Sequence, residues 1–486
     1  MTIKDLKPVL VFSIFDEINH VPRPSKKEEK IRQYLLDFAA KHNIAVRTDA
    51  IGNVVMSKPA TPGKEGAPTV VLQAHMDMVC ESNDKNFDFN TQPITTIVDG
   101  DWLRADGTTL GADNGIGMAA ALAVMVDKDL VHGPVEALFT VDEETGLTGA
   151  NNLGEGMLTG SMLLNLDSED DAEIFVGCAG GVDTTCTFHY DRSMAPTDFQ
   201  YFKIDIAKGL GGHSGGDIHL GRANANKLLA RILWTLGKKY ELSLVEIDGG
   251  NLRNAIPRAA HALFGIHTSH KEEVVAIFNQ YVADVKEEYA DLEPTLELTI
   301  ETIERPDFCI DTTTARHLIE ALYSAPHGVI SMSRDLEGLV ETSTNLASVK
   351  MQADNQILVT TSQRSSVESR KWDIAHQVEA LFELAGAKVS HGDGYPGWKP
   401  NLNSTIMHLA SDAYEELYGV KPAIKAIHAG LECGLFKEKH PHLDMVSFGP
   451  TLRGVHSPSE AMYIPAVERF WGQLTRTLEK VADLKK

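Results

Sequence analysis

The chain has 486 residues, of which 43% are hydrophobic and 23% are charged. This composition is typical of a soluble globular protein and excludes an intrinsically disordered one, while the length predicts two or three domains. The 68 acidic residues outnumber the 45 basic ones and give a formal net charge of −23. Such a charge repels phosphate backbones and anionic lipid, so nucleic acid and membranes are excluded as leading partners.

The N-terminal segment and the cysteines predict a cytoplasmic protein. Asp16 and Glu17 interrupt the apolar run at 9–15 and no small-residue cleavage site follows, so we expect no signal peptide. No apolar stretch approaches the roughly 18 residues that a membrane-spanning helix needs. The five cysteines are dispersed and never form a C-x-x-C pair, which argues against both a disulfide framework and a thiolate zinc site.

The first third of the chain alternates helical and strand patterns. Helical spacing covers 31–43 and 115–130. Continuous apolar runs of strand length cover 69–77, 135–144 and 161–169. Because the runs are continuous rather than alternating, they predict strands covered on both faces, hence a mostly parallel sheet between helices. This pattern is typical of an α/β domain.

The middle of the chain has a different pattern, in which strands outnumber helices. One order of helices and strands recurs after about residue 312, which is consistent either with an internal duplication or with one irregular α+β domain. A Gly/Pro-rich joint then precedes a return to the α/β pattern. We therefore expect an α/β catalytic domain made of residues 1–190 and 398–486, an inserted α+β lid of residues 191–397, and a site in a cleft between them.

Ligand-capable side chains follow several of the predicted strands, where ligands of open α/β sheets bind. They are His75, Asp77, Glu143, Glu144, Asp167 and His456, with Asp113 in a Gly-rich turn ahead of a helix. Two imidazoles and several carboxylates at one sheet edge suit a divalent ion, best zinc, with manganese or cobalt as alternatives. Each residue alone is a weak signal, and the joint occurrence is the evidence.

The pair Glu143-Glu144 offers two roles. Adjacent residues at a strand end point in different directions, so one carboxylate can bind metal while the other faces the substrate as general base. The spacing His75-x-Asp77 likewise offers a ligand and a carboxylate that can hold the far ring nitrogen.

Two glycine-rich segments suggest other chemistry. Residues 212–216 read G-H-S-G-G, which fits the nucleophile elbow of serine hydrolases around Ser214. The elbow needs a helix directly after it, whereas five residues intervene before the helix predicted from Arg222. Residues 111–117 do not have the G-x-G-x-x-G spacing of dinucleotide-binding turns.

These residues resemble the two-metal zinc peptidases that include carboxypeptidase G, aminoacylase, carnosinase and bacterial dipeptidases. Five segments match their metal-site motifs in order: AHMDMV, GADNGIG, VDEETG, NLDSE and GVHSPSE. GGHSGG and NLRNAIPRAA match their lid motifs, while CAGG, YPGW and HAGLECGLF resemble the bacterial dipeptidase branch. The resemblance covers nearly the whole chain and implies an α/β catalytic domain with a lid.

The resemblance implies a role for each residue of the set. It implies that Asp113 bridges two Zn²⁺ ions, with His75 and Asp167 completing one site and Glu144 and His456 the other. Asp77 would orient His75, and Glu143 would be the general base. In the lid, His213 would reach the reacting carbonyl, and Arg364 and Asn254 would hold the terminal carboxylate of the substrate. One departure is Asn114, where relatives often have a second Asp.

The resemblance also implies the activity, which is the hydrolysis of dipeptides with a free amino end, Xaa-His substrates such as carnosine among them. Two other classes stay open: an amidohydrolase of N-acyl amino acids, which would use the same metals, and a non-catalytic cleft-binding protein, which would not need Glu143. By analogy with the dipeptidase branch we expect a homodimer.

Overall fold

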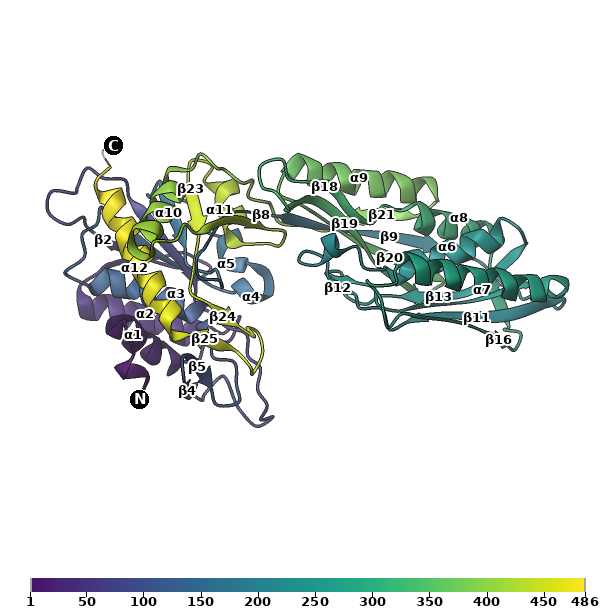
Figure 1. Cartoon of the computed structure of the whole chain (residues 1–486), viewed down its shortest axis with the longest axis horizontal. Helices are drawn as coiled ribbons and strands as arrows, with labels where there is room; N and C mark the ends of the chain where they lie inside the picture. The colour runs from purple at the N-terminus through teal and green to yellow at the C-terminus, as the bar shows by residue number, and fades with distance from the viewer. Residues whose placement is uncertain (1, 485–486) are drawn as a thin grey trace. The chain divides into compact units, whose positions relative to one another are not determined.

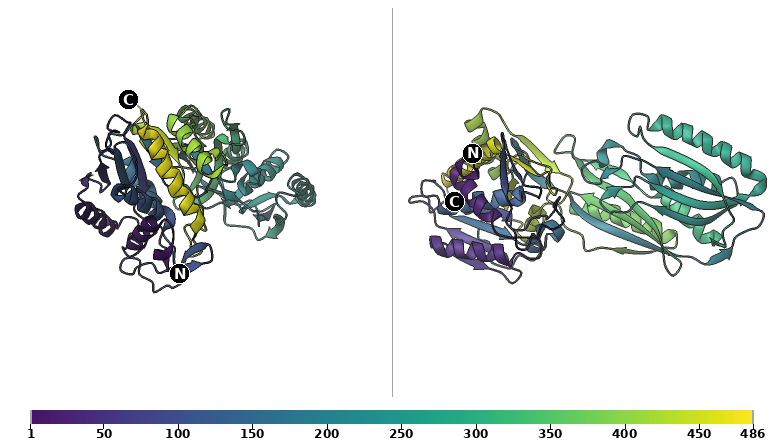
Figure 2. Two further views of the ribbon diagram at one scale, coloured as in Figure 1. Left: turned by 60° about the vertical axis from the view of Figure 1, so that its left-hand side comes forward. Right: turned by 90° about the horizontal axis from the view of Figure 1, so that it is seen from below.

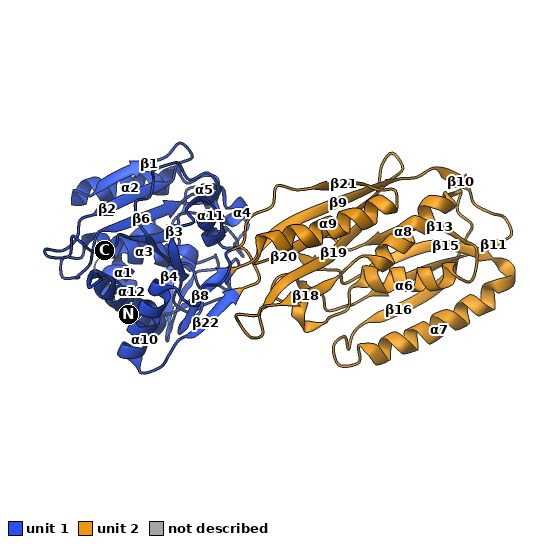
Figure 3. Cartoon of the chain, turned by 90° about the horizontal axis from the view of Figure 1, so that it is seen from above, with its two compact units in different colours: residues 1–177, 398–426, 431–486 blue, residues 178–397, 427–430 orange. Residues whose placement is uncertain are grey.

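The computed structural model describes residues 2–484 and consists of two compact units (Figure 3). Unit 1 comprises residues 1–177, 398–426 and 431–486, and unit 2 comprises residues 178–397 and 427–430. The boundary at 177/178 lies ahead of the predicted boundary at 190/191, because strand β9 (Gly180–His189) pairs along its whole length with strand β20 of unit 2 (Gln356–Ser365). Both chain ends contribute to unit 1, as the sequence pattern indicates.

An eight-stranded sheet runs through unit 1, in the order β1-β2-β6-β3-β7-β23-β8-β22 (Figure 1). Its strands, in that order, are Ala45–Thr48, Val54–Lys58, Val135–Thr140, Val70–His75, Met162–Asn165, Asp444–Ser447, Glu173–Cys178 and Ala423–Ile427. The central strands β6, β3, β7 and β23 are parallel neighbours, whereas β1, β2 and β8 pair antiparallel. The predicted α/β class is therefore confirmed: the strands expected to be parallel are parallel, and antiparallel strands that the sequence pattern did not specify flank them.

Helices cover this sheet, which is why its central strands are buried and mostly apolar. Every residue of β3, β6 and β7 is buried. The helices are α1 (Val9–Asn19), α2 (Glu29–His42), α3 (Ala112–Val126), α4 (Glu143–Gly146), α5 (Thr148–Asn151), α10 (Thr405–Tyr418), α11 (Glu432–Lys439) and α12 (Ile464–Ala482). Helix α3 packs between α1 and β3, and the C-terminal helix α12, yellow in Figure 2, packs on α10.

A small four-stranded sheet completes unit 1. Its order is β24-β25-β5-β4, and its strands are Leu452–Arg453, Ala461–Tyr463, Trp102–Ala105 and Thr96–Asp99. The loop between β24 and β25 carries the C-terminal segment in which His456 was predicted as a ligand.

Unit 2 is built on one nine-stranded antiparallel sheet that contains the same βαββαβ topology twice. One copy is β11 (Phe199–Ala207), α6 (Ala225–Gly237), β13 (Leu242–Gly249), β15 (Ala260–His267), α7 (Lys271–Glu288) and β16 (Glu297–Ile303). The other is β9, α8 (Thr312–Ser324), β19 (Val340–Gln352), β20, α9 (Glu368–Leu384) and β21 (Lys388–His391). The sheet order β16-β11-β15-β13-β19-β20-β9-β21 gives each copy the strand order 4-1-3-2.

This arrangement favours the predicted duplication over a single irregular domain. The first copy is inserted between the first strand and the first helix of the second copy, which is why β9 lies so far in sequence from its partners. The second strands of the two copies pair antiparallel at Gly249 and Val349. Shorter elements of unit 2 are β10 (Arg192–Met194), β12 (Gly212–His213), η2 (Ile218–Leu220), β14 (Ala255–Ile256), β17 (Phe308–Ile310) and β18 (Gly328–Met332).

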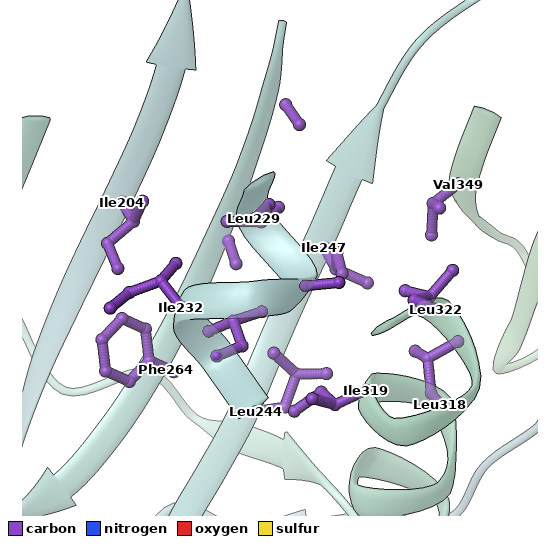
Figure 4. Packing of buried hydrophobic residues seen from close by; sticks show 14 of the residues in the cluster. Ile204, Leu229, Ile232, Leu244, Ile247, Phe264, Leu318, Ile319, Leu322 and Val349 are labelled. Carbon is purple, nitrogen blue, oxygen red and sulfur yellow. The ribbon is translucent and has the colours of Figure 1, made fainter. Parts of the chain in front are cut away.

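One hydrophobic core serves both copies. Figure 4 shows Leu229 and Ile232 of α6 close to the α8 residues Leu318, Ile319 and Leu322, over strands of both copies. All five side chains are buried. Burial of such side chains contributes about 1.5–3 kcal/mol each, so the two copies are joined by their core rather than by the sheet alone. Between residues 2 and 484, no helix combines the length and the hydrophobicity that a membrane crossing requires.

Candidate metal centre and substrate-binding residues

The structure brings the five predicted metal ligands together at one edge of the unit 1 sheet. His75 is the last residue of β3, and Asp167 follows β7 by two residues. Glu144 lies in α4, just after β6, and Asp113 lies at the start of α3. His456 lies in the loop between β24 and β25. Because β3, β6 and β7 are parallel, their carboxyl ends meet at the same edge.

Asp113 lies between two imidazoles and faces one with each carboxylate oxygen. Its Oδ1 is 3.1 Å from His75 Nε2, and its Oδ2 is 3.1 Å from His456 Nε2. Asp167 Oδ1 is 3.5 Å from His75 Nε2, and Glu144 Oε2 is 3.0 Å from His456 Nε2. The five side chains thus form two imidazole–carboxylate pairs that share Asp113.

This donor set fits divalent cations. Ligand atoms of His75, Asp113 and Glu144 lie within 4.8 Å of one another, and imidazole nitrogen with carboxylate oxygen is a donor combination typical of zinc. Glu144 Oε1 is buried and makes no hydrogen bond to any residue in the described part of the chain. A buried carboxylate oxygen without a partner is costly, and a bound cation would supply that partner.

Asp77 contacts both His75 and the turn that carries Glu143 and Glu144. Its Oδ1 and Oδ2 accept hydrogen bonds from the backbone N–H groups of Glu143 (3.0 Å) and Glu144 (3.2 Å), and Oδ2 also accepts one from the Ser25 hydroxyl (2.8 Å). Its Oδ1 lies 3.3 Å from His75 Nδ1, and its carbonyl oxygen lies 3.2 Å from the same nitrogen. Asp77 therefore positions both the ligand His75 and the turn that carries the glutamates.

The sequence analysis placed Glu143 and Glu144 at the end of a strand, but in the structure they do not continue β6. Asp142 has φ 48° and ψ 54°, which turns the chain, and the two glutamates form the first turn of α4. Neighbouring residues on a helix point about 100° apart. The predicted divergence of the two carboxylates therefore holds, with a helical turn rather than a strand end as its cause.

Burial and mutual charge shift the titration of the centre. Burial raises the pKa of Asp167 to about 7 despite His75, with Asp113 and Glu144 adding to the rise. Burial also raises the pKa of Glu143 well above its usual range. For Asp113, hydrogen bonds from the two histidines outweigh burial and lower the pKa. Carboxylates outnumber imidazoles in this buried space, a condition that a divalent cation relieves.

Two further residues support the turn of Asp113, and sequence reasoning missed both. Glu460 accepts hydrogen bonds from four successive backbone N–H groups, those of residues 110–113, at 2.7–3.3 Å. The guanidinium of Arg23 donates to the carbonyls of Gly111 (2.5 Å) and Asp77 (2.9 Å). Glu460 ends the GVHSPSE segment, but no spacing rule connects it to residues 350 positions away.

Asn114 has a contact that accounts for its departure from the family pattern. Its side-chain amide donates a hydrogen bond to Asp167, and the peptide bond that joins it to Asp113 is cis. Only glycine fits beneath it at position 117, because a Cβ there would lie 2.0 Å from Asn114 Oδ1 and 2.5 Å from the Leu166 carbonyl. The amide thus orients a predicted ligand.

Glu432 connects the strands that carry the centre. It is buried and accepts hydrogen bonds from Gln73 Nε2 (2.5 Å) and Thr140 Oγ1 (3.0 Å), near the ends of β3 and β6. Gln73 Oε1 in turn accepts from Asn165 Nδ2 on β7 (2.5 Å). Burial raises the pKa of Glu432 to about 7. The residue lies in the HAGLECGLF segment, which the sequence analysis used only for the resemblance.

In unit 2, His213 has a defined tautomer. Its Nδ1 accepts hydrogen bonds from the backbone N–H groups of Gly215 (3.2 Å) and Gly216 (3.1 Å), so the ring proton is on Nε2. Burial and the charge of Arg364 lower the pKa of His213, against an opposing effect of Asp217. His213 is therefore a neutral hydrogen-bond donor through Nε2.

Arg364 and Asn254, the other predicted lid residues, also lie in unit 2. Arg364 is on β20, and its Nη1 donates to the Tyr395 hydroxyl at 3.1 Å. Its Nε is buried without a hydrogen-bond partner in residues 2–484. Asn254 is exposed, and Asn345 Nδ2 donates to the carbonyls of its two neighbours, at 3.3 and 2.8 Å. Arg364 therefore retains donors for an anion.

His428 is a buried residue of unit 2 that the sequence analysis did not single out. Its Nε2 lies 2.7 Å from the Ser343 hydroxyl. Burial, followed by the charge of Arg364, lowers its pKa to about 3. Because His428 is neutral, Arg364 carries the positive charge near it. This charge favours the binding of an anion at Arg364.

Ser214 does not have the surroundings of a nucleophile. It is buried, and in the described part of the chain its hydroxyl has no hydrogen-bond partner. A serine nucleophile needs a base within hydrogen-bond reach. The segment is followed by η2 and a loop, and α6 begins only at Ala225. The geometry does not support the serine-hydrolase alternative.

The fold and the donor set of unit 1 define a hydrolase with a metal centre, and the family comparison agrees. A sequence model of peptidase family M20/M25/M40 matches residues 71–480. The chain belongs to this family and is a hydrolase that acts on peptide bonds. The resemblance, fold class and enzyme class expected from the sequence are confirmed.

Individual relatives are similar over the whole chain. The cytosol non-specific dipeptidase of Escherichia coli (strain K12) is 43% identical over 481 residues, which cover 99% of each chain. The crystal structure of aminoacylhistidine dipeptidase from Vibrio alginolyticus has a TM-score of 0.95 and 44% identity, and the match covers 100% of this chain and 99% of that one. A tripeptidase from Staphylococcus aureus, with a TM-score of 0.58 and 16% identity over 99% and 100% of the two chains, shares the fold.

Proposed function

We propose that this peptidase hydrolyses dipeptides that have a free amino end, with Xaa-His dipeptides such as carnosine among its substrates. The observation that carries the proposal is the Asp113 carboxylate, whose two oxygens face His75 and His456, each of which also faces a second carboxylate. The names of the two relatives that match over their whole length support the choice of dipeptides.

The centre would hold two Zn²⁺ ions, with Mn²⁺ or Co²⁺ as substitutes. His75 and Asp167 would bind one ion, Glu144 and His456 the other, and Asp113 both. When bound, the ions polarise the scissile carbonyl and lower the pKa of a water ligand towards about 7. The buried Glu144 oxygen without a partner supports this assignment.

Glu143 would accept a proton from the attacking water and deliver it to the leaving amine. Its backbone N–H is held by Asp77 at 3.0 Å, which keeps the carboxylate next to the centre. Burial raises the pKa of Glu143, which strengthens its carboxylate as a base. Asp77 is a positioning residue in this scheme.

Residues of unit 2 would bind the anionic parts of the substrate and of the transition state. His213 would donate its Nε2 proton to the developing oxyanion, in keeping with the tautomer set by Gly215 and Gly216. Arg364 would bind the free carboxylate of the dipeptide, and Asn254 would assist. Recognition of a carboxylate one residue from the scissile bond favours dipeptides over longer chains.

The two units would act as the predicted catalytic domain and lid, and the chain would work in the cytoplasm as a homodimer. The relative from Escherichia coli is described as a cytosol protein, which supports the location. Size-exclusion chromatography with light scattering measures the oligomeric state directly.

A dipeptide panel with metal-stripped and zinc-restored enzyme tests the proposal. We expect activity on free dipeptides, including carnosine, to disappear with the metal and to return at about two zinc ions per chain. N-acetylhistidine is the matched control, because it has the same C-terminal residue without a free amino end. Faster hydrolysis of N-acetylhistidine would favour the amidohydrolase alternative, and full activity after complete metal removal would refute the metal centre.

A further inference from the structure

A second group of imidazole and carboxylate side chains lies in unit 2, outside the centre already described. His376 and Glu379 lie three residues apart on α9, so they share one face of the helix. His391 ends the short strand β21. Ligand atoms of all three residues lie within 4.8 Å of one another.

Buried residues behind this group determine the tautomer of His391. Gln363 Nε2 donates to the hydroxyls of Thr344 (3.1 Å) and Thr361 (2.7 Å), which leaves its Oε1 to accept from the Thr184 hydroxyl (2.8 Å). The single hydroxyl proton of Thr184 is therefore donated to Gln363 Oε1 and cannot be donated to His391. Thr184 Oγ1, 2.9 Å from His391 Nδ1, must accept the Nδ1 proton.

The opposite nitrogen of His391 then faces a carboxylate. Its Nε2 lies 3.3 Å from Glu379 Oε2, and in the neutral ring this nitrogen carries a lone pair. Two acceptors at this distance repel each other unless a proton or a cation lies between them. His376 brings a third ligand atom to the same place. A shared proton needs only two acceptors, whereas a metal ion binds three or more ligands.

We propose that His376, Glu379 and His391 form a divalent-cation site that is separate from the catalytic centre. Two imidazoles and one carboxylate suit Zn²⁺, Ni²⁺ or Cu²⁺, and a hydrogen bond from the far nitrogen, here to Thr184, fixes the ring of His391 as such bonds do in metal-binding histidines. Ligand atoms of one tetrahedral zinc ion lie about 3.4 Å apart, so the three side chains, now within 4.8 Å of one another, must rotate closer together to bind it. Three protein ligands leave a position for water.

The site has a structural consequence within unit 2. Strand β21 is at the edge of the sheet and pairs only with β9 among the described strands. A cation shared by α9 and β21 would join this edge strand to the helix that follows β20. Metal binding should therefore protect residues 388–391 from hydrogen exchange.

Metal counting on the zinc-loaded full-length protein tests the site. After dialysis against micromolar Zn²⁺, we expect one ion per chain beyond those of the catalytic centre. His376→Ala and Glu379→Gln should each weaken its binding at least about tenfold. Glu383→Gln is the matched control, because it removes an exposed carboxylate from the same helix one turn further on, and it should bind like the wild type.

Fluorescence gives a second readout that does not depend on the catalytic metals. The Trp372 ring lies 5.7 Å from each of the rings of His376 and His391, so bound Cu²⁺ or Ni²⁺ should quench it. Trp372→Phe should lose this quenching and keep the additional ion. Dipeptide hydrolysis should be unchanged in His376→Ala. Equal binding in His376→Ala, Glu379→Gln and Glu383→Gln, or no additional ion in the wild type, would overturn the site and favour a protonated His391.

Discussion

The candidate functional residues of the two units differ in charge. In unit 1 they are mostly partly buried carboxylates, brought together near the carboxyl ends of parallel strands. In unit 2 they are a guanidinium, Arg364, and two imidazoles kept neutral, His213 and His428. The residues around Asp113 in unit 1 thus suit cations, and those around Arg364 in unit 2 suit anions.

The difference follows from how each sheet presents its side chains. A parallel sheet places several strand ends at one edge, so acidic residues distant in sequence converge on one point. The antiparallel sheet of unit 2 places Arg364 within β20, while His213 and Asn254 lie in and before the short strands β12 and β14. The proposed reaction needs both kinds of site, because it generates an oxyanion and its substrate ends in a carboxylate.

The largest expected effect tests the division of labour inside unit 1. Glu143→Gln should reduce kcat by about 10²–10⁴-fold, the usual contribution of a general base, and leave the metal content intact. Glu144→Gln, the matched neighbour, should instead lower metal occupancy. Elemental analysis beside steady-state kinetics decides between them, and the reverse pattern would exchange the two roles.

The next effect tests the cationic character of unit 2. Arg364→Ala should lower kcat/KM for free dipeptides by an amount that corresponds to about 2–5 kcal/mol of activation free energy, if the pair of Arg364 and the substrate carboxylate is desolvated. Dipeptides with an amidated C-terminus lack the charge and should be affected much less. Tyr395→Phe is the control, because it removes the hydrogen bond to Arg364 and keeps the guanidinium. Equal losses on acid and amide substrates would make Arg364 structural.

A smaller effect tests how the carboxylates of unit 1 are oriented. Asn114→Ala removes the amide that donates to Asp167, and we expect metal affinity to fall about 10–100-fold. Activity per bound metal should change little, because Asn114 is not assigned to proton transfer. Competition with a chromophoric chelator measures the affinity, and an unchanged value would show that Asp167 needs no support.

The smallest effect tests whether unit 2 has a nucleophile of its own. Ser214→Ala should leave most of the activity, because its hydroxyl contacts no base among residues 2–484. A loss of about 10⁴-fold or more, as expected for a missing nucleophile, would restore the serine-hydrolase interpretation. The rate of dipeptide hydrolysis at saturating zinc is the measurement.

Periodicity and strand-end chemistry were sufficient to predict the α/β unit and a set of candidate ligands, and the family resemblance reduced that set to five. Buried parallel strands are mostly apolar, and ligand-capable residues follow where they end, as at His75 and Asp167. Both signals are local and can be read without the fold. The antiparallel flanks were not predictable in this way, because β1 and β2 are short and only partly buried.

Residues that act across long separations could not be predicted from the sequence. Two examples exist only once the two ends of the chain pack together. Glu460 contacts residues 110–113, and Glu432 lies between Gln73 and Thr140. The same holds for β9, which begins the second βαββαβ copy although the first copy is inserted after it. A local pattern specifies the type of an element and not its partner.

The sequence by itself determined the class of chemistry, since the order and type of the five ligand segments and the Glu143-Glu144 pair are local properties of the chain. The tertiary structure alone decided which oxygen of Asp113 faces which imidazole, which proton His213 carries, and that His376, Glu379 and His391 meet. Those facts depend on distances of about 3–5 Å that only the folded backbone sets, whether the residues are distant in sequence, as Asp113 and His456 are, or close, as His213 and Gly215 are.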